Sequence, residues 1–213
     1  MWQKVSKSFG QVAQEYDAWY QENPIFASEI ETLRNLGPPK QPALEIGVGT
    51  GAFAVALGFD YGLDPSLEML SLAREKGIKA VCGIAERQPF KDKSFNACGM
   101  FFTLCFLEDP KKALSECYRV LKPNGNLYLG VIPKDSPWGV YYEEKARQGH
   151  PLYRYARFLA GEELPSLLDE AGFRLKAGYS SLFISPKASP KKESPKEGLL
   201  TQAGFWAILA EKL

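Results

Sequence analysis

The middle of the chain consists of short apolar runs that alternate with segments of helical spacing. Runs typical of buried strands occur at Ala43–Ile46, Phe59–Leu63, Ile78–Val81, Ser94–Leu104 and Asn126–Val131. Apolar residues at helical spacing lie between them, at Ala52–Leu57, Leu67–Ala73 and Pro110–Leu121. Strands that alternate with helices in this way predict an α/β fold, in which helices cover both faces of a mostly parallel sheet.

The last third of the chain departs from this alternation. Residues 133–160 are rich in aromatic side chains and have weak periodicity, which predicts an insertion. After a helix at Leu164–Ala171, the segments Phe173–Ile184 and Leu199–Leu213 predict two long strands that form a hairpin at the sheet edge. Residues 185–198 contain three prolines among lysines and glutamates and predict a mobile loop, with a nucleic-acid contact as the less favoured alternative.

A glycine-rich turn joins the first predicted strand to its helix. Gly47, Gly49 and Gly51 let the backbone approach a ligand closely, and their spacing differs from the G-x-G-x-x-G of dinucleotide-binding proteins. Glu45 precedes them, and its carboxylate repels a pyrophosphate but attracts an ammonium or sulfonium group. S-adenosylmethionine carries both of these cationic groups. A turn that binds no ligand is the alternative interpretation.

Asp64 ends the second predicted strand, where a carboxylate can accept hydrogen bonds from both hydroxyls of a ribose. NAD-dependent proteins use an acid at the same position, so Asp64 predicts a nucleoside ligand without choosing between the cofactors. The alternative is that Asp64 caps the following helix, with Ser66 as the competing cap. Pro65, at the first helical position, is compatible with both roles.

Together these motifs resemble the class I S-adenosylmethionine-dependent methyltransferases, in the small-molecule branch called methyltransferase type 11 (UbiE-like). The resemblance extends from about residue 9 to the C-terminus. It implies a Rossmann-like sheet of seven mostly parallel strands with one antiparallel edge strand. It also implies a single domain over residues 1–213, comprising lid helices at 1–36, a cofactor-binding core at 41–132, an acceptor-pocket insertion at 133–160 and the loop at 185–198.

The resemblance also implies which residues contact the cofactor. Ile84 stands where many family members have an aspartate that contacts adenine, so the backbone of Ile84 and Ala85 is expected to replace that contact. Tyr16 lies in a segment that resembles the family's lid helix, whereas its neighbour Trp19 is expected to pack in the core. The expected cofactor-binding residues are Tyr16, Glu45, Gly47, Val48, Gly49, Gly51, Asp64, Pro65, Ile84, Ala85, Glu86 and Thr103.

The aromatic insertion occupies the position where relatives build the acceptor pocket, and its tyrosines are suited to hold a cationic amine or a metalloid by cation–π contact. His150 is the only histidine, so any histidine general base must be this residue, although transfer from a sulfonium does not require a strong base. Cys105 is either a methyl acceptor or soft contact, or a small apolar filler. His150, Cys105 and Tyr141 are therefore the catalytic candidates.

Composition narrows the choice of partners. The formal net charge of +1 over 213 residues gives no reason to expect nucleic acid, and no apolar run approaches the roughly 20 residues that span a bilayer. The N-terminus lacks an apolar signal core, so we expect a cytoplasmic protein. The cysteines have no C-x-x-C spacing, so no metal is expected, and Cys82, Cys98 and Cys117 are expected to be buried thiols. The sequence does not predict an oligomeric state.

The sequence thus predicts an enzyme that transfers a methyl group from S-adenosylmethionine to a small-molecule acceptor by in-line displacement. One alternative is a non-catalytic protein that binds S-adenosylmethionine, since Ile84 and Asn96 depart from the family pattern. A nicotinamide-dependent oxidoreductase is a weaker alternative, because the glycine spacing and Glu45 disfavour a pyrophosphate. An acceptor cavity filled by the chain's own side chains would favour the non-catalytic protein, and an open one the enzyme.

Overall fold

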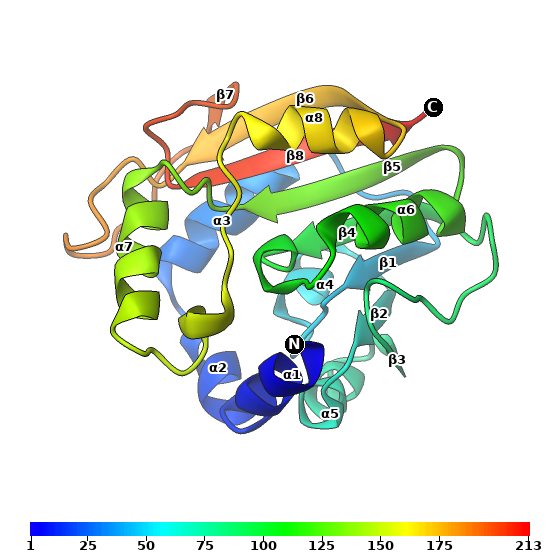
Figure 1. Ribbon diagram of the computed structural model, residues 1–213, viewed down its shortest axis with the longest axis horizontal. Coiled ribbons are helices and arrows are strands. Elements are labelled where there is room, and N and C mark those ends of the chain that lie inside the picture. Colours follow the sequence, from blue (N-terminus) through cyan, green and yellow to red (C-terminus); the bar gives the residue numbers. More distant parts are fainter.

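The computed structural model describes residues 1–213, which form one eight-stranded sheet between two layers of helices (Figure 1). The strand order is β3-β2-β1-β4-β5-β8-β6-β7. The strands are β1 Ala43–Ile46, β2 Tyr61–Asp64, β3 Lys79–Cys82, β4 Phe95–Phe101, β5 Leu121–Val131, β6 Phe173–Ser181, β7 Lys196–Glu197 and β8 Phe205–Lys212. The helices are α1 Trp2–Gly10, α2 Ala13–Trp19, α3 Pro24–Arg34, α4 Ala52–Leu57, α5 Leu67–Glu75, α6 Pro110–Val120, α7 Pro137–Arg147 and α8 Glu163–Glu170, with 3₁₀ turns at η1 Leu104–Phe106 and η2 Tyr153–Tyr155.

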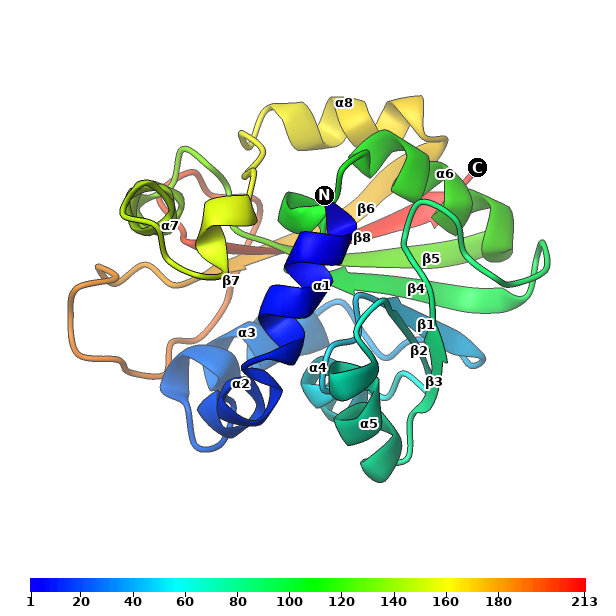
Figure 2. The same cartoon turned by 60° about the horizontal axis from the view of Figure 1, so that its bottom comes forward.

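Strand β1 lies at the centre of the parallel part of the sheet, and all four of its residues are buried. Because side chains alternate along a strand, Leu44 and Ile46 join one half of the core while Ala43 joins the other. Helices α6 and α8 cover one face of the sheet, and α3, α4 and α5 cover the opposite face (Figure 2). The carboxyl ends of β1, β2 and β4 therefore meet at the point where the strand order reverses, which is where such sheets bind ligands.

The predicted mostly parallel, Rossmann-like sheet is confirmed, with eight strands in place of seven. The additional strand is the two-residue β7, which pairs with β6 inside the segment 185–198 that was predicted as a loop. Strand β8 pairs antiparallel with both β5 and β6, so it lies between them. The last two long strands are adjacent and antiparallel, as the hairpin prediction required.

Positive backbone φ angles end two of the predicted strands early. The strand predicted at Ser94–Leu104 stops at Phe101, because Phe102 has a φ of 57° and the chain then turns into η1. The strand predicted at Phe173–Ile184 stops at Ser181, because Leu182 has a φ of 61°. These departures move Phe102 out of the sheet and to its carboxyl edge.

The aromatic insertion is more regular than its weak periodicity predicted. Helix α7 begins at Pro137, and the Oγ of Ser136 caps it by accepting a hydrogen bond from the Gly139 N–H (3.0 Å). The segment 185–198 is anchored by Glu193, whose carboxylate accepts hydrogen bonds from the N–H groups of Phe183 (2.8 Å) and Ile184 (3.2 Å). Mobility of that segment remains a prediction.

Two residues expected in the interior are exposed. Trp19 is 45% exposed, because the inward face of the short α2 is formed by Tyr16 and the adjoining Tyr20, which leaves Trp19 outside the core at the edge of a cavity. Cys82 is exposed because it ends the edge strand β3, whereas Cys98 and Cys117 are buried as expected.

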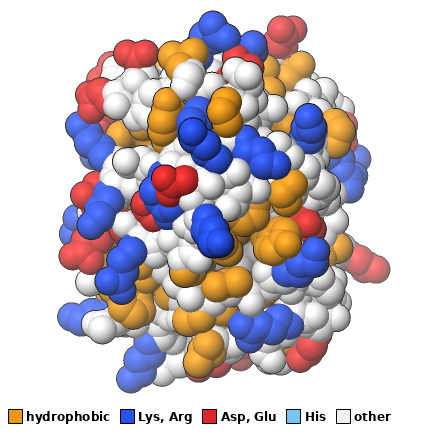
Figure 3. Space-filling view, turned by 90° about the vertical axis from the view of Figure 1, so that its right-hand side faces the viewer, with side chains coloured by type: hydrophobic (Ala, Val, Ile, Leu, Met, Phe, Trp, Pro, Cys, Tyr) orange, Lys and Arg blue, Asp and Glu red, His pale blue; other side chains and the backbone are white.

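The surface carries charges of both signs. Figure 3 shows one side of the molecule, on which lysines and arginines are scattered among acidic side chains and small hydrophobic patches, as the formal net charge of +1 would suggest. None of the helices combines the length and the apolar character that crossing a membrane requires. No three His, Cys, Asp or Glu side chains are grouped so that they could hold a metal ion.

Candidate functional site

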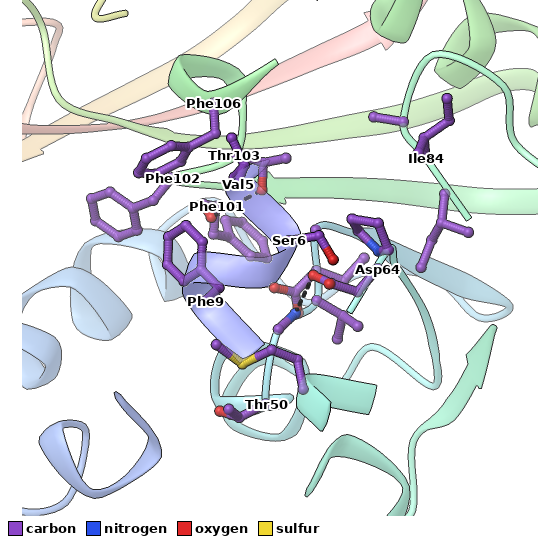
Figure 4. A pocket seen from close by; sticks show the side chains of 18 of the residues that line it. Val5, Ser6, Phe9, Thr50, Asp64, Ile84, Phe101, Phe102, Thr103 and Phe106 are labelled. Atoms are coloured by element: carbon purple, nitrogen blue, oxygen red, sulfur yellow. Dashed lines mark hydrogen bonds between the residues drawn. The ribbon is translucent and has the colours of Figure 1, made fainter. Parts of the chain in front are cut away.

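A cavity of about 910 Å³ lies at the carboxyl ends of β1, β2 and β4, beneath α1 (Figure 4). It is lined by every residue that was expected to contact the cofactor except Gly51. Gly51 serves the fold instead: it begins α4 with a φ of +83°, and a Cβ there would lie 3.3 Å from the Cα of Ala73 on α5. The structure thus brings the expected residues together at one cavity, although the first of them, Tyr16, and the last, Thr103, are 87 positions apart in the sequence.

The glycine turn has one filled side and one open side. At Gly47, whose φ is +73°, a Cβ would lie 2.4 Å from Oγ1 of Thr103, and that hydroxyl donates a hydrogen bond to the carbonyl of Ile46 (3.0 Å). At Gly49, no atom lies within 4 Å of the position that a Cβ would take. The backbone at Gly49 is therefore accessible to a ligand in the cavity.

Asp64 is held in place by two backbone groups. Its Oδ2 accepts a hydrogen bond from the Gly49 N–H (3.0 Å), and its Oδ1 accepts one from the Ser66 N–H (2.9 Å). Ser66 is the residue that caps α5, because its Oγ accepts the Met69 N–H (3.3 Å), so the alternative role of Asp64 as the helix cap is wrong.

The carboxylate of Asp64 remains available to a ligand. Burial raises its pKa to about 6, and the N–H groups of Ser66 and Gly49 oppose that rise. Most Asp64 side chains are therefore ionised at pH 7, and each oxygen keeps an acceptor site in addition to its backbone bond. This combination suits a ligand with two neighbouring hydroxyl groups.

Glu45 is a buried carboxyl without a cation. It is 1% exposed, and its Oε2 has no hydrogen-bond partner. Burial raises its pKa well above the ordinary value, the charge of Asp64 adds to the rise, and the Ala54 N–H opposes it. A buried polar atom left without a partner is costly, and an ammonium group of a ligand would satisfy it. The residues present therefore fit S-adenosylmethionine, with acceptors for a ribose at Asp64 and for an amino group at Glu45.

The loop formed by Ile84, Ala85 and Glu86 also borders the cavity, and its side chains differ in what they contact. The Oε1 of Glu86 accepts hydrogen bonds from the N–H groups of Glu108 (3.1 Å) and Asp109 (3.4 Å), so Glu86 ties together the two loops that border the cavity. Ile84 and Ala85 line the cavity beside it. The side chains of Ile84 and Ala85 offer no polar group, so a backbone contact to a ligand at these two residues stays a prediction.

Helix α1 forms a roof that sequence reasoning missed. Its residues Trp2, Val5, Ser6 and Phe9 line the cavity, although none of its residues is buried (Figure 4). The ring of Phe9 packs edge-on against Phe106 at a centroid distance of 5.1 Å. The available signal was the spacing of Trp2, Val5 and Phe9, which puts three apolar side chains on one helix face.

A second cavity, of about 1310 Å³, lies between the N-terminal helices α2 and α3 and the aromatic insertion. Its aromatic lining residues are Phe9, Tyr16, Trp19, Tyr20, Phe102, Phe106, Tyr142, Tyr153 and Phe158. Five of them also line the first cavity, namely Phe9, Tyr16, Tyr20, Phe102 and Phe106. The two cavities therefore adjoin along these five side chains, which we call the shared aromatic wall.

The three catalytic candidates occupy different environments. His150 lines the second cavity, and its Nδ1 accepts hydrogen bonds from the N–H groups of Leu152 (3.3 Å) and Tyr153 (3.4 Å). Because Nδ1 is an acceptor, the proton of the neutral ring is on Nε2, and burial, with Lys145 second, lowers the pKa of His150. The Nε2–H of His150 has no partner within the chain and is free to donate a hydrogen bond.

Cys105 also lines the second cavity, and burial raises its pKa to about 12, so its thiol is protonated at neutral pH. Tyr141 lines neither cavity; its ring contacts that of Tyr142 (5.5 Å between centroids) and the Nζ of Lys145 (4.7 Å from the centroid). Cys105 therefore offers no ionised nucleophile, and Tyr141 does not line the cavity.

Comparison with known proteins finds methyltransferases among the relatives of this chain. A family model described as a methyltransferase domain matches residues 44–129. The structure of a Thermotoga maritima protein titled a SAM-dependent methyltransferase and possible histamine N-methyltransferase is 35% identical, covers 98% of this chain and 100% of that one, and superposes with a TM-score of 0.90. An uncharacterized protein of Mycobacterium tuberculosis is 42% identical over 97% of this chain and 74% of its own length. The demethylmenaquinone methyltransferase of Renibacterium salmoninarum is 31% identical over 70% of this chain and 68% of its own length.

Proposed function

Because this chain belongs to the S-adenosylmethionine-dependent methyltransferases, we propose that it transfers a methyl group to a small-molecule acceptor held in the second cavity. The observation that carries this proposal is the shared aromatic wall, along which the two cavities adjoin. When bound, S-adenosylmethionine supplies a methyl group that its sulfonium already activates, so the chain's main task is to align acceptor and methyl group.

The residues of the first cavity have distinct proposed roles. Asp64 accepts the ribose hydroxyls, and Glu45 accepts the amino group of the methionine part, for which its unpartnered Oε2 is suited. The backbone of Ile84 and Ala85 contacts the adenine. Helix α1 and Tyr16 cover the cavity and exclude water, which strengthens the electrostatic attraction between Glu45 and a cationic ligand.

In-line displacement requires the acceptor atom to approach the methyl group from the side opposite the sulfur. The second cavity is suited to present that atom, because it adjoins the first along the shared aromatic wall. The Nε2–H of His150 is available to orient a polar group of the acceptor. The Thermotoga maritima protein is described as a possible histamine N-methyltransferase, which is consistent with a small-molecule acceptor.

The structure favours the enzyme over the two alternatives. A protein that only binds S-adenosylmethionine has no need of an acceptor cavity, whereas the second cavity here is open and is not filled by side chains. A nicotinamide cofactor is disfavoured because the glycine turn lacks the G-x-G-x-x-G spacing and because an ionised Glu45 would repel a pyrophosphate.

Calorimetric titration with S-adenosylmethionine, S-adenosylhomocysteine and NADH tests the cofactor assignment. We expect micromolar binding of the first two ligands, no binding of NADH, and loss of binding in Asp64→Ala. Asp169→Asn is the matched control, because Asp169 is an exposed carboxylate outside both cavities. Binding of NADH alone, or of none of the three, would contradict the proposal. Acceptor screening by release of S-adenosylhomocysteine then separates the enzyme from a non-catalytic binder.

A further inference from the structure

Glu29 is a buried acid that the roles proposed so far leave unused. It lies on α3, where the neighbouring buried hydroxyls of Ser28 and Thr32 donate hydrogen bonds to the carbonyls of Pro24 (2.7 Å) and Ser28 (2.6 Å). Glu29 itself lines the second cavity, is 4% exposed, and has no hydrogen-bond or ion-pair partner for its carboxyl. Burial alone raises its pKa well above the ordinary value. Its oxygens are not among the fully buried unpartnered atoms, so they open onto the cavity, where a group from outside the chain can bind them.

Tyrosines of α2 and α7 line the same cavity as this carboxyl. Burial raises the pKa of Tyr16 to about 12, and the charge of Glu29 contributes to that rise. The pKa of Tyr142, on the opposite side of the cavity, is raised by burial first and by Glu29 second. Glu29 thus shares the cavity with Tyr16 of α2 and Tyr142 of α7 and interacts electrostatically with both. An unpaired acid among aromatic faces is the chemistry that recognises a cation.

The cavity wall does not neutralise Glu29 itself. Lys145 is the only lysine or arginine that lines the cavity, and its Nζ lies 4.7 Å from the centroid of the Tyr141 ring, without an ion pair to Glu29. His150 also lines the cavity, and its pKa is lowered by burial and by Lys145, so its ring is neutral at pH 7. A cationic ligand would supply the missing positive charge.

Each cavity is lined by one buried acid, Glu45 in the first and Glu29 in the second, and Tyr20 lines both cavities. The pKa of Tyr20 is raised by burial first, with smaller contributions that include the charges of Glu29 and Glu45. If Glu45 binds the amino group of the methionine part, as proposed above, Glu29 is left to face the acceptor. The two acids thus divide the site into a donor half and an acceptor half.

We propose that Glu29 binds the amino group of the methyl acceptor, so that the substrate is a primary or secondary amine with an apolar body. This inference rests on the function proposed above. The aromatic side chains of the second cavity hold the apolar body, and the carboxyl of Glu29 selects the nitrogen.

Glu29 also provides a place for the proton that the amine must lose. The bound ammonium transfers one proton to the carboxylate of Glu29, which leaves a neutral nitrogen with a free lone pair. That lone pair forms the N–C bond to the methyl group while the C–S bond breaks and its electron pair stays on sulfur. The products are a methylammonium ion and a neutral thioether. The proton on Glu29 then leaves to solvent, and the restored carboxylate pairs with the new cation.

Two probes of the same shape test the charge preference. The protein is saturated with S-adenosylhomocysteine, and 2-phenylethylamine is titrated against its neutral analogue 2-phenylethanol. We expect the amine to bind about tenfold or more tightly than the alcohol, the scale of a hydrogen bond to a charged group. Equal affinities, or no binding of the amine up to about 10 mM, would overturn the inference.

Glu29→Gln keeps the shape of the side chain and removes its charge. We expect this variant to bind the alcohol as the wild type does and to lose the preference for the amine, with affinity for S-adenosylhomocysteine unchanged within about twofold. Glu31→Gln is the matched control, because Glu31 lies on the same helix, lines neither cavity and pairs with Lys192. A Glu29→Gln protein that keeps the amine preference would also overturn the inference.

The design separates this inference from the function on which it rests. If the wild type fails to bind S-adenosylhomocysteine, the proposed function is wrong; if it binds the cofactor but does not prefer the amine, only the inference is wrong. The wild-type comparison decides the matter even if Glu29→Gln does not fold. A purely structural role of Glu29 predicts that Glu29→Gln lowers the melting temperature. The proposed binding role predicts the opposite, because removing an unpaired buried charge should leave the melting temperature unchanged or raise it.

Discussion

At the scale of single residues, Asp64 and Glu45, two of the three acids that line the first cavity, can be tested independently of each other. The ligand 5′-methylthioadenosine carries the ribose but lacks the amino acid part, so it should depend on Asp64 and be indifferent to Glu45. We expect Asp64→Asn to weaken its binding about tenfold or more, because the charged acceptor is lost. Titration calorimetry at pH 7.5 would measure this, with Asp169→Asn as the control. An unchanged affinity would show that Asp64 does not hold the ribose.

The same ligand should reveal the titration of Asp64. Burial raises the pKa of this carboxyl to about 6, and the ribose hydroxyls bind its ionised form. We therefore expect the affinity for 5′-methylthioadenosine to be constant above about pH 7 and to fall as the pH drops through 6. The Asp64→Asn variant should lose this dependence. Affinity that is flat between pH 5 and 8 in the wild type would contradict the assignment.

Glu45 should discriminate between ligands with and without the amino acid part. We expect Glu45→Gln to weaken the binding of S-adenosylhomocysteine about tenfold or more and to leave that of 5′-methylthioadenosine within about twofold. The reason is that the unpartnered Oε2 of Glu45 has an ammonium group to bind in the first ligand alone. Equal losses for both ligands would instead indicate a general disturbance of the glycine turn.

At the scale of elements, α1 should behave as a ligand-dependent roof. None of its residues is buried, so in the free protein it should open at little cost, whereas Val5, Ser6 and Phe9 face the cavity that a ligand fills. We expect saturating S-adenosylhomocysteine to slow amide hydrogen exchange in residues 2–10 by about tenfold or more. Helix α8 lines no part of this cavity and is the internal control. Unchanged exchange in α1 would mean that the ligand binds without this roof.

The elements also show what could be predicted from the sequence. Glu45, Asp64 and the glycine turn were identified because adjacent stretches of chain place them at the ends of neighbouring strands. Glu29 was missed because α3 reads as an ordinary amphipathic helix, and the approach of Tyr142 to it depends on how α7 packs. The exposure of Trp19 depends on tertiary contacts, and the turn at Phe102 depends on a positive backbone φ angle. Neither feature leaves a periodic pattern in the sequence from which it could be predicted.

At the scale of the whole molecule, the first cavity is lined only by residues from the first half of the chain, Trp2 to Leu107. The second half nevertheless shares its core, because one buried cluster includes Leu44 and Ile46 of β1, Leu164 of α8 and Ala210 of β8. The sheet is also continuous from β3 to β7. A ligand that binds the first half should therefore stabilise the entire chain.

This continuity predicts one thermal transition that shifts as a unit. S-adenosylhomocysteine at a hundredfold excess over its Kd contributes about 2.7 kcal/mol, which corresponds to a rise of about 5 to 10 °C in the melting temperature of a domain of this size. Differential scanning calorimetry should show a single peak both with and without the ligand. The melting temperature of Asp64→Asn should rise less at the same ligand concentration, because its affinity is lower. Two peaks, of which only one moves, would mean that β6, β7 and β8 unfold separately from the cofactor-binding half. The shared core argues against that result, because separating the halves would expose the apolar contacts between β5 and β8 to water.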